Sequence, residues 1–212
     1  MKGIFMKVID QNTWERKEIF DLFSAADYPF YSITIPVDVT KVKEVSTNKG
    51  ISFYYLMIWV CTKAVNSVPN FLLRVRDGQV VMLDQTNPSF TYLKKGSELF
   101  QIITMPWEED YMEFCRHAKE RSEAQTGFLD QEKETDELIY FSCTPWFGFT
   151  ALTNEHKLDK DDTVPHLAWG KYYKEQDRLM VHLSVEVNHR TVDGFKSGKL
   201  KERIDREIEA LY

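Results

Sequence analysis

Apolar and polar residues alternate over residues 179–187, where every second side chain is Leu or Val. A period of two residues predicts a strand with one buried face. Further along, apolar side chains recur at helical spacing to the end of the chain, at Leu200, Ile204, Ile208 and Leu211. Between these two elements lie His189, Asp193 and Gly194. We expect His189 to lie where the strand ends and Asp193 to begin the helix, because a carboxylate favours a helix N-terminus.

The same patterns predict the other elements of the chain. Helices are expected from Asn12 onward, with Asn12 as the cap, and over residues 52–68 and 108–125. Strands are expected over residues 33–38, 74–81 (a hairpin turning at Asp-Gly), 90–94, 99–104, 138–142, 166–174 and 178–187. Residues 154–163 are expected to form a charged loop. No repeat or linker divides the chain, so residues 1–212 are predicted to form a single mixed α/β domain.

Composition narrows the class of protein. The 212 residues are 43% hydrophobic and 28% charged, as in globular proteins, and the net charge of −6 argues against binding to nucleic acid. The N-terminus lacks the apolar stretch of a signal peptide, and residues 53–61 are too few to span a membrane. The cysteines Cys61, Cys115 and Cys143 are scattered and form no CxxC pair. We therefore expect reduced thiols and a cytoplasmic protein.

Histidine is the side chain best suited to act as a general base near neutral pH, and the position of His189 makes it the candidate. The other histidines, His117, His156, His166 and His182, are interpreted as structural. His182 and His189 do not have the spacing of metal ligands on one strand face, so no zinc site is expected. Ser142 lacks the flanking glycines of a hydrolase nucleophile.

The motif His-x-x-x-Asp-Gly at residues 189–194 resembles the signature of the chloramphenicol acetyltransferase family, which dihydrolipoyl acyltransferase catalytic domains share more loosely. The resemblance covers nearly the whole chain. It also includes Trp-Glu-Arg at residues 14–16, Asn-Pro-Ser-Phe-Thr at 87–91, Ser-Cys-Thr-Pro-Trp at 142–146 and Gly-Lys-Tyr at 170–172, in the family's order.

This resemblance implies a fold, a reaction and an assembly. The fold would be the family's two-layer sandwich, a large mixed β-sheet flanked by helices. The reaction would be acetyl transfer from acetyl-CoA to a hydroxyl, with chloramphenicol the leading acceptor and no metal or prosthetic group. The assembly would be a homotrimer whose sites lie at subunit interfaces, with His189 from one chain and much of the acceptor pocket from its neighbour.

The resemblance also assigns roles to residues. His189 would be the general base and Ser142 the donor to the oxyanion. Asp193 would pair with Arg16, which the helix dipole disfavours near a helix start, and the pair would fix the turn that aims His189. Lys171 would lie near the phosphates of coenzyme A. The residues that would line the acceptor pocket are Phe23, Tyr31, Thr91, Phe100 and Ile102.

Three positions depart from the family pattern. Asn188 stands where a second histidine is usual, Ala168 where a threonine near the oxyanion is common, and Lys196 where a histidine is frequent. Loss of the threonine is expected to reduce the rate, and changes in the pocket to alter the acceptor. Two alternatives therefore stay open: an acyltransferase for another hydroxyl or amine, and a non-catalytic trimer that binds a ligand.

Overall fold

A large mixed sheet forms the centre of the molecule. The computed structural model describes residues 5–156 and 158–212. The strand order is β2-β10-β8-β7-β5-β6, with β9 paired to β10; β7 runs parallel to β5 and β8, and the other neighbours are antiparallel. These strands are β2 (Phe30–Asp38), β5 (Asn87–Leu93), β6 (Phe100–Thr104), β7 (Leu138–Thr144), β8 (His166–Gly170), β9 (Tyr173–Glu175) and β10 (Arg178–Asn188).

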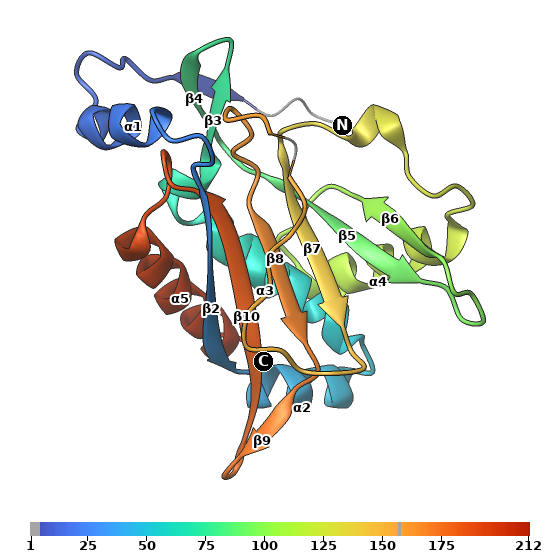
Figure 1. Ribbon diagram of the computed structural model, residues 1–212. Helices are drawn as coiled ribbons and strands as arrows, with labels where there is room; N and C mark the ends of the chain where they lie inside the picture. The colour runs from blue at the N-terminus through green and yellow to red at the C-terminus, as the bar shows by residue number, and fades with distance from the viewer. Residues whose placement is uncertain (1–4, 157) are drawn as a thin grey trace.

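Helices cover one face of this sheet (Figure 1). They are α2 (Thr40–Lys49), α3 (Phe53–Asn66), α4 (Tyr111–Ala124) and α5 (Gly194–Glu209). α3 is central and packs against the other three, and ten of its fourteen residues are buried. Alternate residues of the strands complete the core beneath it, including Phe90, Phe141, Leu167 and Val185. None of the described helices is long and apolar enough to cross a membrane.

A smaller layer lies at one end of the large sheet. Its three strands have the order β1-β4-β3, and α1 lies beside them (Figure 1). The bounds are β1 (Met6–Val8), α1 (Lys17–Ser24), β3 (Leu73–Arg76) and β4 (Gln79–Leu83), with short 3-10 turns η1 (Pro69–Leu72) and η2 (Gln131–Lys133). The predicted Asp-Gly turn joins β3 to β4, with positive φ at Asp77 and Gly78. Phe20 of α1 is buried against this layer.

The first helix does not begin at Asn12, and that prediction was wrong. Asp10, and not Asn12, supplies the local side-chain acceptor, because its carboxylate accepts from the backbone N–H of Asn12 at 3.0 Å and from the hydroxyl of Thr13 at 3.1 Å. These bonds close a turn, and α1 starts only at Lys17. Arg16 is therefore the residue that precedes the helix, with its side chain turned away to another partner.

One helix was missed by prediction, and one predicted strand is divided in two. α2 was not predicted, because its apolar positions are few among Lys, Thr and Ser; it ends at Gly50, whose φ of 66° is the left-handed conformation of a helix end. The single strand expected over 166–174 is two strands, β8 and β9. β8 ends at Gly170, where a Cβ would lie only 2.7 Å from the carbonyl oxygen of Phe147, so the chain 145–150 crosses there at close range.

Candidate active site

His189 lies directly after β10, in the turn that leads to α5. Its backbone N–H donates to the carbonyl of Pro29 at 2.7 Å, which extends the pairing of β10 with β2 to the end of the strand. The imidazole stacks on Phe23, with ring centroids 3.8 Å apart, and its centroid lies 4.6 Å from that of Tyr31. Nδ1 is buried and has no hydrogen-bond partner in the described chain. We call His189, Phe23 and Tyr31 the histidine group.

Arg16 fixes the backbone of the histidine turn. Its Nε donates to the carbonyl of Arg190 at 3.0 Å and its Nη2 to the carbonyl of His189 at 3.1 Å. Its Nη1 forms an ion pair with Asp193, so the predicted contact between Arg16 and Asp193 is present although 177 positions separate them. Asp193 also accepts from the backbone N–H of Lys196 at 3.0 Å as the cap of α5. One guanidinium thus holds both ends of the turn.

The charge of Asp193 is stabilised by the same contacts. Burial alone would raise the pKa of this carboxyl, but hydrogen bonds from Arg16 and from the backbone of Lys196 outweigh that effect and lower its pKa. Arg16 is only 6% exposed, so its charge requires a partner of this kind.

Ser142 lies in β7, on the face of the sheet opposite the helices. The neighbouring Phe141 points into the helix-covered core, which turns Ser142 the other way. In β5, Thr91 follows Phe90, the residue paired with Phe141, and Thr91 is in turn paired with Ile102 of β6. Phe100, two residues earlier in β6, is 48% exposed.

The residues predicted to face the substrate thus form two separate sets. Ser142, Thr91, Ile102 and Phe100 share one region of the open sheet face, and we call them the serine group. Ser142 pairs with Ala168, and Ala168 pairs with Ser184 of β10, five residues before His189. At about 4.8 Å per strand and 3.3 Å per residue, Ser142 and His189 lie roughly 19 Å apart within one chain. One chain therefore does not bring its own His189 and its own Ser142 together.

Lys171, predicted to bind coenzyme A, follows Gly170 at the end of β8. Its backbone N–H donates to the carbonyl of Phe147 at 2.9 Å, and its side chain is exposed. Beside it lie Trp146 and Phe147, which are 65% and 58% exposed. The side chain of Lys171 is thus exposed, and the contact with a phosphate of coenzyme A that the resemblance implies stays a prediction.

Comparison with known proteins identifies the family of the chain. A model of the family described as chloramphenicol acetyltransferase matches residues 4–205. The chain belongs to the chloramphenicol acetyltransferase family. It is an acyltransferase, as expected, and members of this family use acetyl-CoA as co-substrate, bind chloramphenicol and form trimers.

Individual relatives support the same assignment. A chloramphenicol acetyltransferase of Clostridium perfringens is 30% identical over 193 residues, which are 88% of this chain and 90% of that protein. One from Proteus mirabilis is 28% identical over 210 residues, covering 97% of this chain and 95% of the relative. A solved chloramphenicol acetyltransferase structure shares the fold, with a TM-score of 0.89, 24% identity and coverage of 96% of this chain and 100% of the other. The predicted fold class is confirmed.

The three departures from the family pattern occupy distinct places. Ala168 is buried next to Ser142, so its methyl group stands where the threonine common in the family would place a hydroxyl beside Ser142. Asn188 is buried, and its amide donates to the carbonyls of Lys160 at 2.8 Å and Asp162 at 2.9 Å. Lys196 contributes its backbone N–H to Asp193, a contact that any residue but proline makes. Asn188 thus ties the loop before β8 to the end of β10, next to His189.

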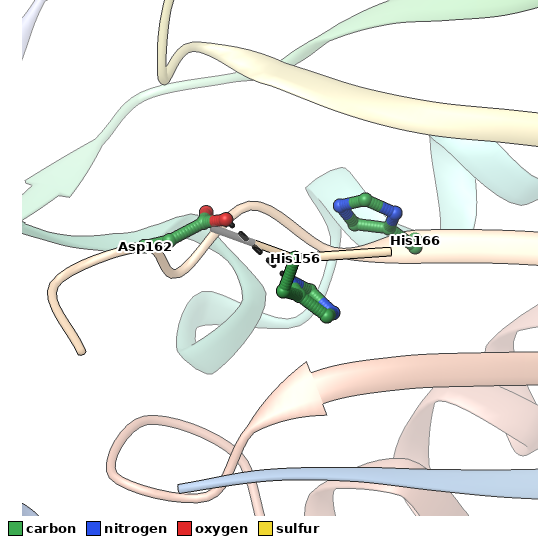
Figure 2. A group of neighbouring side chains, drawn as sticks. All are labelled: His156, Asp162 and His166. Atoms are coloured by element: carbon green, nitrogen blue, oxygen red, sulfur yellow. Dashed lines mark hydrogen bonds and ion pairs between the residues drawn. The ribbon is translucent and has the colours of Figure 1, made fainter. Parts of the chain in front are cut away.

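Two of the histidines interpreted as structural belong to a partly buried polar cluster that could not be predicted from the sequence. His156, Asp162 and His166 present ligand atoms that all lie within 4.8 Å of one another (Figure 2). His156 also lies 3.2 Å from a carboxylate oxygen of Glu186, and both of these side chains are 1% exposed. Spacing along the strand concerned only His182 and His189, whereas the fold assembles a different set of ligands.

The charges of this cluster differ between its two histidines. Burial would lower the pKa of His156, but Asp162 and Glu186 outweigh it and raise that pKa to about 9. The pKa of His166 is lowered to about 4, first by burial and then by the charge of His156. His166 is therefore neutral at pH 7 and has a free nitrogen lone pair.

Proposed function

We propose that the protein transfers the acetyl group of acetyl-CoA to a hydroxyl of chloramphenicol, at sites formed between neighbouring copies of the chain in a homotrimer. The observation that carries the proposal is the separation of the histidine group from the serine group. Each group holds one half of the machinery for acyl transfer, and each belongs to a part of the surface that a second copy can reach. A ring of three copies joins every histidine group to the serine group of a neighbour.

In this reaction His189 is the general base. Its Nδ1 is enclosed, so Nε2 is the nitrogen that we assign to the acceptor hydroxyl. Nε2 takes the hydroxyl proton while the hydroxyl oxygen attacks the thioester carbonyl carbon, and the carbonyl oxygen becomes an oxyanion. The hydroxyl of Ser142 from the neighbouring chain donates to that oxyanion. When the intermediate collapses, the C–S bond breaks, and the thiolate of coenzyme A takes the proton from the imidazolium.

The remaining assigned residues position the base and the acceptor. Phe23 stacks on the imidazole and restricts its rotation, and the hydroxyl of Tyr31 is fixed 3.1 Å from that of Ser197. Thr91, Phe100 and Ile102 of the serine group offer one hydroxyl and apolar surface, which suits an aromatic acceptor with several hydroxyls. We assign Lys171 to a phosphate of coenzyme A.

Two broader features complete the proposal. We treat residues 1–212 as one domain, since the main core joins all four helices α2–α5 to the large sheet. We place the reaction in the cytoplasm, because three scattered cysteines without a CxxC pair suit a reducing compartment.

The first test is release of thiol from acetyl-CoA with and without chloramphenicol, for the wild type, His189→Ala and His182→Ala. His182 stacks on Tyr173 away from the histidine turn and is the matched control. We expect release that depends on the drug in the wild type and in His182→Ala, and a loss of at least about 100-fold in His189→Ala. Thiol release that does not depend on chloramphenicol but is stimulated by another hydroxyl or amine would refute chloramphenicol as the acceptor. It would leave the role of His189 as the base unchanged.

A second test addresses the shared site. His189→Ala chains and Ser142→Ala chains are each expected to be inactive alone. After the two are mixed and reassembled, each hybrid trimer has one interface with an intact histidine and an intact serine. Random mixing at equal amounts then restores roughly a quarter of the wild-type activity in a closed ring of three. Hybrids that form but stay inactive would contradict a site shared between chains.

A further inference from the structure

We propose that His156, Asp162 and His166 form a binding site for a divalent transition-metal ion of the zinc class. The site is separate from the acyl-transfer machinery and does not depend on its assignment. His156 and Asp162 lie in the segment between β7 and β8, and His166 is the first residue of β8. The fold brings one ligand atom of each within 4.8 Å of the other two (Figure 2).

The donors match this class of ion in chemistry, provided that the incoming ion displaces the proton that His156 otherwise holds between Asp162 and Glu186. Two imidazole nitrogens and one carboxylate oxygen are a common zinc ligand set, whereas magnesium and calcium prefer oxygen ligands alone. His166 Nε2 is buried without a hydrogen-bond partner among residues 5–156 and 158–212. A buried nitrogen of this kind is costly unless something binds it. An ion among the three residues would satisfy it.

The carboxylate and the second imidazole are already oriented. One oxygen of Asp162 accepts the backbone N–H of Val164 at 3.1 Å, and the other lies 3.5 Å from Nδ1 of His156. Asp162 therefore keeps Oδ2 for an ion, on the side where His156 lies. The side chain of Asp162 is 26% exposed, which gives an ion a route from solvent.

Glu186 supplies the outer contact that metal-binding histidines usually have. The Oε1 atom of Glu186 lies 3.2 Å from Nε2 of His156, although the ring N–H is not aligned for a hydrogen bond. The Oε2 atom of Glu186 accepts from Asn154, from its backbone N–H at 2.6 Å and from its side-chain amide at 3.0 Å. A carboxylate behind a ligating imidazole fixes the ring and strengthens it as a ligand. Glu186 thus leaves Nδ1 of His156 as the nitrogen turned toward Asp162.

The loop that carries the donors is held at several points. Asn188 donates to the carbonyls of Lys160 and Asp162, and Arg190 donates to the carbonyl of Lys160 at 2.6 Å and to the carboxylate of Asp161 at 2.8 Å. These bonds preorganise the site, which lowers the cost of ordering it around an ion.

The test is calorimetric titration of the intact wild-type protein, freed of metal with a chelator, with Zn²⁺ alone. We expect one ion per chain, with binding lost in His166→Asn and weakened by roughly 10- to 100-fold in Glu186→Gln, the usual effect of removing an outer partner. The matched control is His117→Asn, since His117 also faces a carboxylate, that of Glu108 at 2.8 Å, outside the cluster. It is expected to bind as the wild type does.

Three outcomes would overturn the proposal: no stoichiometric binding by the wild type, wild-type affinity in His166→Asn, or equal loss in His117→Asn. The first would leave His156 as an imidazolium held between two carboxylates. If His166→Asn does not fold, Glu186→Gln and Asp162→Asn decide the question. Absorption of bound Co²⁺ provides a second readout, since its visible bands report imidazole and carboxylate ligands in a tetrahedral site and are expected to disappear in Asp162→Asn.

Discussion

Replacing Arg16 by lysine separates its charge from its geometry. The guanidinium makes three contacts at once, to the carbonyls of His189 and Arg190 and to the carboxylate of Asp193. Lysine keeps the positive charge on a single nitrogen and cannot reach all three acceptors. The substitution therefore keeps one contact and releases the others, and the turn that carries His189 loses its restraint.

The expected loss follows from the contacts. A hydrogen bond from a charged donor contributes about 1.5–3 kcal/mol, and two are lost. We expect the low end of the range for the two lost bonds together, a decrease of about 3 kcal/mol in the unfolding free energy. The lysine nitrogen keeps one contact, and the side chain of Asp193 is 24% exposed and retains its bond from Lys196. A displacement of about 1 Å at the base costs on the order of 100-fold in rate, so kcat is expected to fall by that factor.

The assay pairs urea unfolding with steady-state kinetics. Asp193→Asn is the companion variant: asparagine caps a helix as well as aspartate, so it removes the charge and retains the cap of α5. Arg76→Lys is the control, because Arg76 pairs with Asp136 on a partly exposed hairpin far from His189 along the chain. It is expected to cost no more than about 1 kcal/mol and to leave kcat unchanged. If Arg16→Lys loses stability but keeps full kcat, the idea that Arg16 aims His189 is wrong.

Three further predictions concern the same site. The pKa of Asp193 lies below its ordinary value of 3.8, so its contribution to stability is complete above about pH 4 and is lost as the pH falls through its lowered pKa. The unfolding free energy of Asp193→Asn is therefore expected to depend less on pH below 4 than that of the wild type. Equal slopes of unfolding free energy against pH in the two proteins would contradict this. Ser142→Ala is expected to lower kcat by about 10²–10³-fold with little change in melting temperature, and an unchanged kcat would remove Ser142 from the reaction. Ala168→Ser adds a hydroxyl beside Ser142 and is expected to raise kcat, by less than the roughly 10²-fold effect of a full oxyanion donor; a lower kcat at wild-type stability would argue against that placement.

Local elements were accessible from the sequence because their signals are local. The alternation over residues 179–187 and the Asp193 cap predicted β10 and α5 closely, and the Asp-Gly turn predicted the β3–β4 hairpin. α2 could not be predicted from the sequence, because its apolar positions are too few to show the helical period. The start of α1 was misplaced because Asp10 competed with Asn12 for the turn.

The class of fold, the family motifs and the identity of the candidate base could be predicted from the amino-acid sequence, because each depends on residues close together in the chain. Which distant residues meet depends on the three-dimensional fold. A period of two identifies the face of a strand but carries no information on the order of strands in the sheet. That order separates Ser142 from His189 and draws His156, Asp162 and His166 together. The proposed metal site follows from long-range pairing, which no local pattern encodes, whereas a site shared between chains was already expected from the family resemblance.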